Sequence, residues 1–308
     1  MRAKAFCPGH ITGFFEICDQ FSDPLKRGSR GGGLSVDKGV MTEVSVQESA
    51  HATLEISING KIENAPVTKS VVHQMLKSNR GTSARRIEVK HEAQIPVGCG
   101  IGSSGAGAWG TALALNQLLE LHLTYDRVGQ IAHRAEVENQ TGLGTVSAQQ
   151  RGGIEIRTEP GAPGIGHVDQ IPFDPDLRIV CSSQGPISTK SMLSNPTVRA
   201  KINQYGGDMV AKIREDASPE ELMRLSRSFS EKTFLLSQSL KEGLQLLDRK
   251  GYKNSSMALF GETLFSIVWA DEAEEILRIL REWNKQGEAF TAKVDSIGAR
   301  VLECEQDE

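Results

Sequence analysis

Residues 96–107 read Pro96-Val97-Gly98-Cys99-Gly100-Ile101-Gly102-Ser103-Ser104-Gly105-Ala106-Gly107. The glycines of this stretch leave the backbone bare, so that its N–H groups can approach a polyphosphate closely. A helix that starts near Ser104 would add the positive end of its dipole, and the two serine hydroxyls can reach phosphate or Mg²⁺. We therefore expect a phosphate-binding loop, in preference to a flexible turn that only joins a strand to a helix. The expected nucleotide contacts are Pro96, Gly98, Gly100, Gly102, Ser103, Ser104, Gly105 and Gly107.

Two other nucleotide-binding motifs compete for this stretch. Gly100-x-Gly102-x-x-Gly105 fits the dinucleotide fingerprint, which requires a buried parallel strand before it and an acidic residue at the end of the next strand. The preceding residues 86–90 instead alternate with charges, and Glu120 falls inside an expected helix. A Walker A loop requires a lysine after its glycines, and none is present. The sequence therefore argues against both a dinucleotide-binding fingerprint and a Walker A loop.

The composition is that of a globular protein without nucleic-acid or membrane features. The formal net charge of the 308 residues is −4 and no basic block occurs, which argues against a nucleic-acid partner. The five cysteines are scattered and form no Cys-x-x-Cys pair, as expected of reduced thiols in a cytoplasmic protein. Glycine, proline and histidine interrupt the apolar residues at the N-terminus, so we expect neither export nor membrane insertion.

Hydrophobic periodicity predicts strands before the glycine loop and helices after it. Residues 41–46 and 54–58 alternate as half-buried antiparallel strands do, and Asn59-Gly60 is a hairpin turn signal. A short helix is expected over residues 70–76. After the loop the expected elements are helices over residues 108–121 and 125–138, the latter capped by Thr124, and a strand over residues 154–157.

Proline and glycine repeatedly interrupt residues 159–164, which we read as a connector between two domains, residues 1–165 and 166–308. In the second domain we expect a strand at residues 178–182 and several helices, including residues 219–248 and 272–286. The last apolar stretch, residues 289–301, is expected to return to the sheet.

The motif Pro96-x-x-x-Gly100-Ile101-Gly102-Ser103-Ser104-Gly105-Ala106 resembles the central motif of the GHMP kinases, the superfamily of galactokinase, homoserine kinase and mevalonate kinase. Phe6-Cys7-Pro8-Gly9-His10-Ile11-Thr12 is similar to the N-terminal motif of that family. The resemblance implies an α+β protein with the GHMP kinase fold. It would have an N-terminal domain like ribosomal protein S5 and a ferredoxin-like C-terminal domain.

Longer stretches resemble the archaeal pantoate kinases more narrowly. These stretches are Pro8-Gly9-His10-Ile11-Thr12-Gly13-Phe14-Phe15, Gly28-Ser29-Arg30-Gly31, Glu136-Val137-Glu138-Asn139-x-Thr141-Gly142-Leu143-Gly144 and Ala258-Leu259-Phe260-Gly261-Glu262. The resemblance implies an enzyme that uses ATP and Mg²⁺ to phosphorylate pantoate to 4-phosphopantoate for coenzyme A synthesis, and a homodimer. The alternatives are another hydroxyl acceptor, such as homoserine or a mevalonate-like acid, and a non-catalytic regulator that binds ATP.

The family pattern also implies the catalytic residues. Ser104 is expected to contact Mg²⁺ and the β- and γ-phosphates, and a glutamate of the following helix is expected on Mg²⁺. Glu136 and Glu138 are both candidates because each flanks the apolar stripe of that helix, and the resemblance favours Glu136. Thr145 stands where many GHMP kinases have an aspartate, which leaves the catalytic base open. His10 and His133 are candidate proton acceptors.

Pantoate carries a carboxylate, which requires hydrogen-bond donors. Arginine suits bidentate recognition of a carboxylate, and hydroxyls can complete the set. The expected substrate contacts are Ser29, Arg30, His133, Arg157, Ser188, Thr189 and Lys190.

Overall fold

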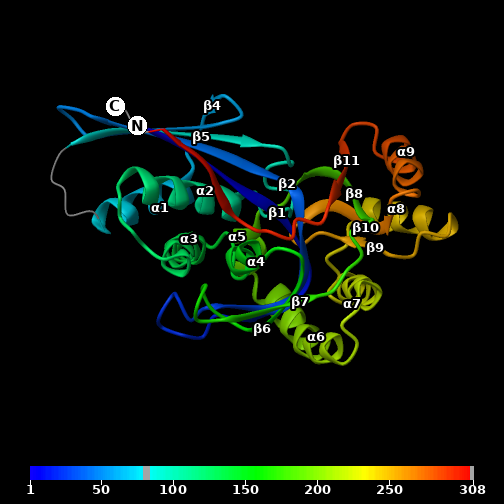
Figure 1. Cartoon of the computed structure of the whole chain (residues 1–308). Helices are drawn as coiled ribbons and strands as arrows, with labels where there is room; N and C mark the ends of the chain where they lie inside the picture. Colours follow the sequence, from blue (N-terminus) through cyan, green and yellow to red (C-terminus); the bar gives the residue numbers. More distant parts are fainter. Residues whose placement is uncertain (79–83, 306–308) are drawn as a thin grey trace.

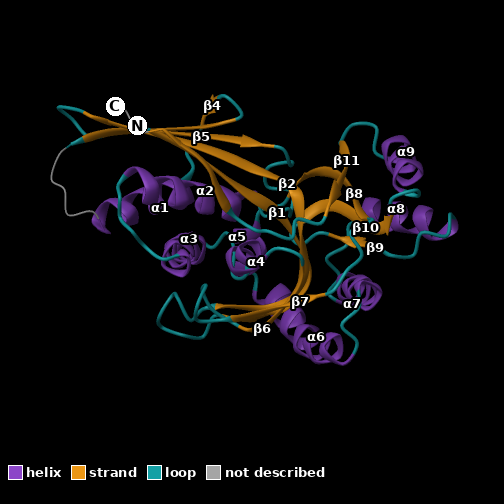
Figure 2. Cartoon of the chain, in the orientation of Figure 1, coloured by secondary structure: helices purple, strands orange, loops and turns teal. Residues whose placement is uncertain are grey.

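A computed structural model describes residues 1–78 and 84–305, which form two β-sheets covered by helices (Figures 1 and 2). In this described part the first sheet has eight strands in the order β12-β1-β2-β5-β3-β4, with β6 paired to β2 and β7 paired to β6. The strands are β1 (Arg2–Cys18), β2 (Gly28–Glu48), β3 (Thr53–Ile58), β4 (Lys61–Ile62), β5 (Arg85–Ala93), β6 (Ile154–Glu159), β7 (His167–Ile171) and β12 (Arg300–Glu305).

The long hairpin of β1 and β2 is the frame of the first sheet. The antiparallel pairing shifts register between Pro8 and Gly9 and again between Thr12 and Phe14. Such irregularities bend a strand and increase its twist. Beyond the bend, the first half of β2 changes partner from β5 to β6, so that Gly31 lies opposite Arg157 and Gly33 lies opposite Glu155.

Helices α1 (Pro66–Ser78), α2 (Ser103–Leu118) and α3 (Tyr125–Asn139) lie on one face of this sheet (Figures 1 and 2), with α4 (Thr145–Arg151) beside them. The connection from β3 to β5 contains β4 and then α1, and the helix supplies the crossover that these two parallel strands require. Trp109 of α2 is fully buried, and its Nε1–H donates to the carbonyl of Val146 at 2.9 Å. Thr124 caps α3 by accepting from the N–H of Arg127, which confirms the expected N-cap.

The second sheet consists of β8 (Leu177–Pro186), β9 (Ser255–Met257), β10 (Gly261–Trp269) and β11 (Glu288–Lys293). Its order is β11-β8-β10-β9 and all of its pairs are antiparallel. If these four strands are numbered 1 to 4 along the chain, their order across the sheet is 4-1-3-2. Helix α8 (Gln238–Arg249) precedes strand 2 of this numbering, and α9 (Ala273–Trp283) precedes strand 4. This is the ferredoxin-like arrangement expected from the family resemblance.

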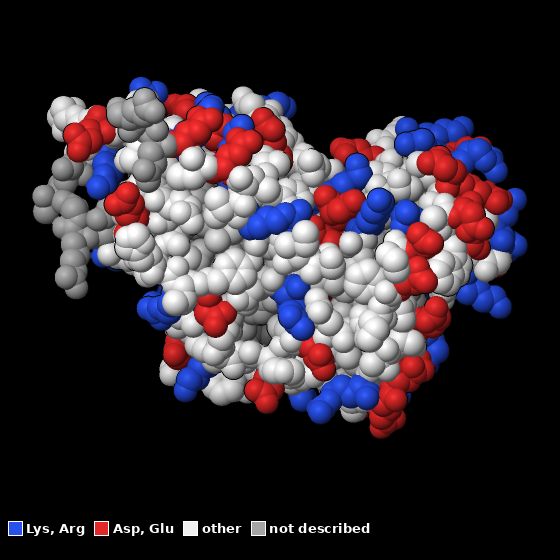
Figure 3. Space-filling model, viewed as in Figure 1, with Lys and Arg blue, Asp and Glu red and all other residues white. Residues whose placement is uncertain are grey.

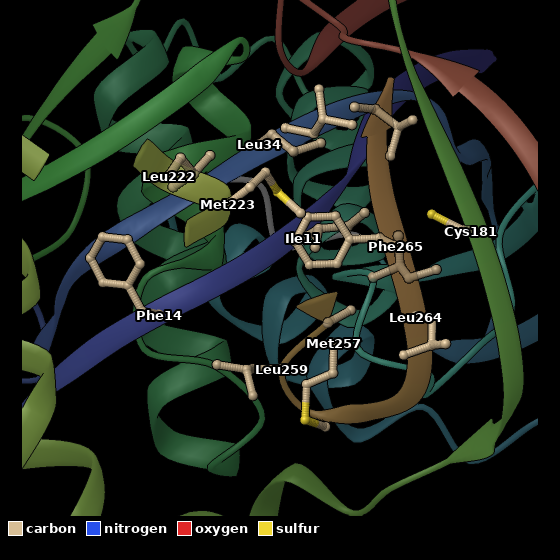
Figure 4. Packing of buried hydrophobic residues seen from close by; sticks show 14 of the residues in the cluster. Ile11, Phe14, Leu34, Cys181, Leu222, Met223, Met257, Leu259, Leu264 and Phe265 are labelled. Atoms are coloured by element: carbon tan, nitrogen blue, oxygen red, sulfur yellow. The ribbon is translucent and has the colours of Figure 1, made fainter. Parts of the chain in front are cut away.

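The two sheets share one hydrophobic core. Helices α5 (Thr189–Ser194), α6 (Pro196–Glu215) and α7 (Pro219–Lys232) follow β8, and α6 and α7 pack against β1. In Figure 4, side chains of β1 and β2 gather with Leu222 and Met223 of α7 and with Leu264 and Phe265 of β10. The site described below lies where these parts meet.

Several expected elements differ in extent or pairing. The expected helix at residues 108–121 starts five residues earlier, at Ser103, so the glycine loop itself contains the first turn. β3 pairs antiparallel with β4 across Asn59-Gly60, as expected, but it pairs in parallel with β5, because alternation reports the exposed face and not the direction of each neighbour. The stretch at residues 289–301 divides between β11 in the second sheet and the start of β12 in the first.

The expected domain boundary at residues 165 and 166 separates β6 from β7, which are neighbours in the first sheet. The C-terminal strand β12 also returns to that sheet and pairs with β1. The chain beyond residue 166 therefore contributes to both sheets.

Positive and negative side chains are interspersed on the face drawn in Figure 3. Among the helices of residues 1–78 and 84–305, none has both the length and the apolar composition needed to cross a bilayer.

The shared core predicts a large stability loss from one truncation. Phe265 is 1% exposed, so Phe265→Ala should lower the free energy of unfolding by about 3–5 kcal/mol, because it removes buried apolar area and leaves a cavity. Urea unfolding followed by circular dichroism measures this change. The matched control is Ile62→Ala at a side chain that is 74% exposed, where a change within about 0.5 kcal/mol is expected. Equal effects of the two substitutions would contradict the packing described.

Candidate active site

The glycine loop is a cradle of backbone N–H groups at the start of α2. Gly98, Gly100 and Gly102 have φ values of 76°, 81° and 67°, a conformation that glycine adopts without steric cost. Gly102 caps the 16-residue α2 without a side-chain hydrogen bond. The first N–H groups of the helix are therefore not satisfied by a cap and point beyond the end of the helix, as an anion site requires.

Both sheets hold this loop in place. The N–H of His10 in β1 donates to the carbonyl of Ile101 at 3.0 Å, and the hydroxyl of Thr263 in β10 donates to the carbonyl of Cys99 at 2.8 Å. A Cβ added to Gly100 would lie 2.8 Å from the carbonyl carbon of Phe260. The loop is therefore packed against backbone on several sides.

Ser104 and Glu136 meet at the end of the loop. The Ser104 hydroxyl donates to Oε1 of Glu136 at 2.5 Å, and the Thr141 hydroxyl donates to the same oxygen at 2.7 Å. Glu136 is 2% exposed, and a Cβ on Gly142 would lie 2.3 Å from its Oε2. Burial raises the pKa of the Glu136 carboxyl, and the two hydroxyl donors act in the opposite direction. Glu138, the other candidate, is exposed.

The oxygens of Ser104 and Glu136 suit Mg²⁺, which is a hard cation that prefers oxygen ligands. Mg²⁺ commonly takes one or two carboxylates from the protein and completes its shell with substrate phosphates and water. Within residues 1–78 and 84–305 no group of three or more His, Cys, Asp or Glu side chains is suitably placed to hold a metal. The oxygens of Ser104 and Glu136 could hold an ion whose remaining ligands are phosphate oxygens and water.

A cavity opens beside this pair, and we call it the first cavity. β1, β2, the glycine loop, the end of α3, the start of α4, α5 and the turn before β10 all contribute to its wall. It is lined by His10, Thr12, Phe15, Ser29, Gly98, Gly100, Gly102, Ser103, Ser104, Gly105, Glu136, Thr141, Gly142, Leu143, Gly144, Thr145, Thr189, Leu193, Leu259 and Phe260.

Among the residues expected to act in catalysis or to contact the substrate, the first cavity brings together Ser104, Glu136, His10, Thr145, Ser29 and Thr189. Ser188 lies at the N-cap of α5, where its hydroxyl accepts from the N–H of Ser191, and Lys190 is exposed on that helix. Arg30 lies outside the lining, and its Nε–H donates to Glu16 at 2.7 Å.

His133 is buried in α3 away from this lining. Its Nε2 is 2.8 Å from the carbonyl oxygen of Arg27. Burial lowers its pKa to about 4, although the backbone carbonyls of Arg27 and Pro24 act in the opposite direction. The ring is therefore neutral at pH 7.

Arg157 lies behind the wall of the first cavity together with a residue that the sequence analysis missed, Glu155. Both side chains are buried, and Nη1 of Arg157 donates to Oε1 of Glu155. A Cβ on Gly144 would lie 2.2 Å from the Ser29 hydroxyl and 2.8 Å from Nε of Arg157, so the lack of a side chain at Gly144 leaves room for both donors. The two charges sit two residues apart on β6, a spacing that places both on one face and that could have drawn attention to Glu155.

A second cavity adjoins the first and was not expected from the sequence. The two share Gly98, Ser103, Ser104 and Thr141. The wall of the second is mainly apolar and is built by Val40, Ile58, Asn64, Ala65, Pro66, Val67, Thr68, His91, Ala93, Val97 and Gly107. Burial lowers the pKa of His91 to about 4, and its ring bonds the hydroxyls of Thr42 and Thr68. Of the expected nucleotide contacts, Gly107 lines only this cavity and Pro96 lines neither.

Known proteins resemble this chain over nearly its whole length. Residues 67–153 match the family model described as the GHMP kinases N terminal domain. The pantoate kinase of Thermococcus kodakarensis is 36% identical over 288 residues, which cover 92% of this chain and 93% of that protein. The chain belongs to the pantoate kinase family. A second member, from Methanocaldococcus jannaschii, is 33% identical over 276 residues, covering 90% and 96% of the two chains.

The fold agrees with this membership of the pantoate kinase family. A solved structure titled as a phosphotransferase related to the CoA biosynthesis pathway superposes with a TM-score of 0.88 at 34% identity. The match covers 98% of this chain and 99% of that one. The GHMP kinase fold expected from the family resemblance is thereby confirmed.

The burial of His133 predicts a pH dependence of stability. Unfolding returns its pKa from about 4 to the ordinary 6.5, so the unfolded chain binds the proton first as pH falls. This stability is present above pH 6.5 and is lost as pH falls towards 4, by about 3 kcal/mol in total. His133→Gln should lack this loss, so its free energy of unfolding relative to wild type should rise on acidification.

Urea unfolding between pH 7 and pH 4.5 measures the difference between the two proteins. His51→Gln, at an exposed histidine, is the matched control. A difference between His133→Gln and wild type that stays constant over this range would contradict the assignment.

Proposed function

We propose that this chain transfers the γ-phosphoryl group of ATP to the primary hydroxyl of pantoate, forming 4-phosphopantoate. The observation that carries the proposal is the pairing of Ser104 with the buried carboxylate of Glu136 at the glycine loop, where the first and second cavities meet. Membership of the pantoate kinase family supports the choice of acceptor.

In this proposal the two cavities divide the substrates. The mainly apolar second cavity takes the nucleobase, with Asn64 and Thr68 as its polar contacts. The β- and γ-phosphates lie against the N–H groups of the glycine loop and the start of α2, which are aimed at developing negative charge. Ser104 and Glu136 would hold Mg²⁺, which when bound neutralises charge on the phosphate oxygens.

The acceptor would occupy the first cavity. Ser29 and Thr189 offer hydroxyls to the pantoate carboxylate. Nε of Arg157, which lies next to Gly144, is a buried donor that has no hydrogen-bond partner in the protein. This leaves the hydroxyl of pantoate to face Ser104 and the phosphates. Such positioning accounts for most of the rate in phosphoryl transfer, because the loose transition state requires little bond formation by the protein.

The lining of the first cavity favours a hydroxy acid over homoserine. Homoserine carries an ammonium group, and Glu136 is the one acidic residue among the lining residues of the described chain. That carboxylate is already engaged by Ser104 and Thr141. A mevalonate-like acid shares the carboxylate and hydroxyl of pantoate and is therefore the alternative that the assay below must separate. A regulator that binds ATP without turnover is the other.

The kinase proposal predicts a substrate preference and two inactive variants. ADP formation should be at least about 100-fold more efficient, as kcat/KM, with pantoate than with pantothenate, homoserine or mevalonate. Ser104→Ala and Glu136→Gln should each lower kcat by about 100-fold to 1,000-fold, because each removes a group that stabilises charge in the transition state. Coupled-enzyme detection of ADP measures both effects.

Glu138→Gln is the matched control, since Glu138 lies two residues from Glu136 but is exposed. It should retain wild-type turnover. Loss of turnover in Glu138→Gln with retention in Glu136→Gln would reverse the assignment of the metal ligand. Binding of ATP without ADP formation from any hydroxy acid would favour the regulator.

A further inference from the structure

Three ionisable side chains are buried together at the wall of the first cavity, which His10 lines and which Glu155 and Arg157 do not. His10 of β1 is 1% exposed, and Glu155 and Arg157 of β6 are 0% and 2% exposed. Nε2 of His10 lies 2.7 Å from Oε1 of Glu155, the same oxygen that accepts from Arg157. Burying charge is costly unless the charges are paired, and a protein can often replace such a cluster with apolar residues at no loss of stability. A buried cluster of this kind therefore points to a role beyond stability.

The sheet is built to make room for this cluster. Gly33 lies opposite Glu155 in the β2–β6 pairing, and a Cβ there would be 2.8 Å from Nε2 of His10 and 2.9 Å from Oε1 of Glu155. Gly31 lies opposite Arg157, and a Cβ there would be 2.9 Å from Nη2 of Arg157. Side chains at these two positions would displace the cluster.

The cluster leaves one nitrogen of His10 without a protein partner. Nδ1 is buried and unbonded, while Nε2 is engaged by Glu155. A neutral imidazole that donates through Nε2–H to a carboxylate has its lone pair on Nδ1, where it can accept a proton. His10 also lines the first cavity, together with Ser104 and Thr145. Thr145 itself cannot act as a base at neutral pH.

We propose that His10 is the proton acceptor for the substrate hydroxyl, through Nδ1, and that Glu155 and Arg157 are positioning residues for it. This inference rests on the kinase function proposed above. As the hydroxyl oxygen bonds to the γ-phosphorus, the bond from that phosphorus to the β–γ bridging oxygen breaks and its electron pair leaves with ADP. The hydroxyl proton passes to Nδ1, and the resulting imidazolium is paired with Glu155 until the proton returns to solvent.

The electrostatics of the cluster suit this step. Burial lowers the pKa of His10 and the charge of Arg157 adds to that effect, while Glu155 opposes it, so the ring is neutral before reaction. Burial alone would raise the pKa of Glu155, but Arg157 and His10 outweigh it and the pKa is lowered. Glu155 is therefore ionised. Gly33 of β2, which lies beside Nε2, carries no titratable group, and Thr145, which shares the cavity lining with His10, does not titrate near neutral pH.

The experiment measures single-turnover phosphorylation of pantoate between pH 5 and 8 with wild type, His10→Gln and Glu155→Gln. Glutamine keeps a donor for Glu155 but has no group equivalent to Nδ1. The rate of wild type should fall at acid pH, and His10→Gln should lower the rate by about 100-fold or more and remove that fall. The KM for ATP should change by less than about threefold, because His10 is not among the groups assigned to the nucleotide.

Glu155→Gln should slow turnover and move the acid limb of the rate profile to lower pH, because the carboxylate that raises the pKa of His10 is gone. Circular dichroism checks the folding of this variant, since Arg157 loses its partner. If Glu155→Gln does not fold, the profiles of wild type and His10→Gln decide the question. His73→Gln, at an exposed histidine of α1, is the matched control and should keep the wild-type profile.

The outcomes separate the two proposals. An active wild type whose His10→Gln variant keeps its rate within about threefold, or keeps the acid limb, overturns the role of His10 and leaves the kinase function standing. A stability loss in His10→Gln without a change in the pH profile would mean that the cluster is only structural. A wild type that forms no ADP with pantoate overturns both proposals.

Discussion

The site depends on one hydrogen bond between two segments that lie 32 residues apart, from the Ser104 hydroxyl to the buried carboxylate of Glu136. It joins the first turn of α2 to the end of α3 and places a carboxylate beside a cluster of free N–H groups. Burial disfavours the ionised form of Glu136 and raises its pKa. A cation next to this carboxylate, in place of the Ser104 hydroxyl proton, would therefore compensate its charge and be held there. The same contact thus stabilises the helix pair and prepares a site for a metal–phosphate complex.

Ser104 is placed beside Glu136 because both sheets hold the glycine loop in position. β1 binds the loop through the N–H of His10, and β10 binds it through the hydroxyl of Thr263. The core shared by β1, α7 and β10 fixes the relation between these strands (Figure 4). A cavity between two elements that share a core keeps its shape, which is what in-line transfer between two bound substrates requires.

Local sequence was enough to predict the parts of the site that local forces determine. Thr124 caps α3 because its hydroxyl meets a free N–H three residues away, and the glycines of the loop are needed where φ is positive. Periodicity could not choose between Glu136 and Glu138, because both flank the buried stripe of α3. The choice depends on α2, which brings Ser104 to only one of them.

The features that sequence reasoning missed depend on distant pairing. In the sequence, Glu155 is indistinguishable from a polar residue on the solvated face of a strand. In the structure, Gly33 of β2 lies opposite it and leaves room for a buried carboxylate. The parallel pairing of β3 with β5 and the return of β12 to β1 likewise depend on partners that no local pattern identifies. Each of these pairings is determined by two segments that are far apart in the sequence.

The most direct test of the account is the position of the metal. Crystals grown with Mn²⁺ in place of Mg²⁺, a non-hydrolysable ATP analogue and pantoate give an anomalous signal at the ion. The account predicts one Mn²⁺ bound by the Ser104 hydroxyl, a Glu136 oxygen and the β- and γ-phosphates, at about 2.1 Å from the protein oxygens. Mn²⁺ held by Glu138, or by the phosphates alone while Ser104 still donates to Glu136, would contradict it.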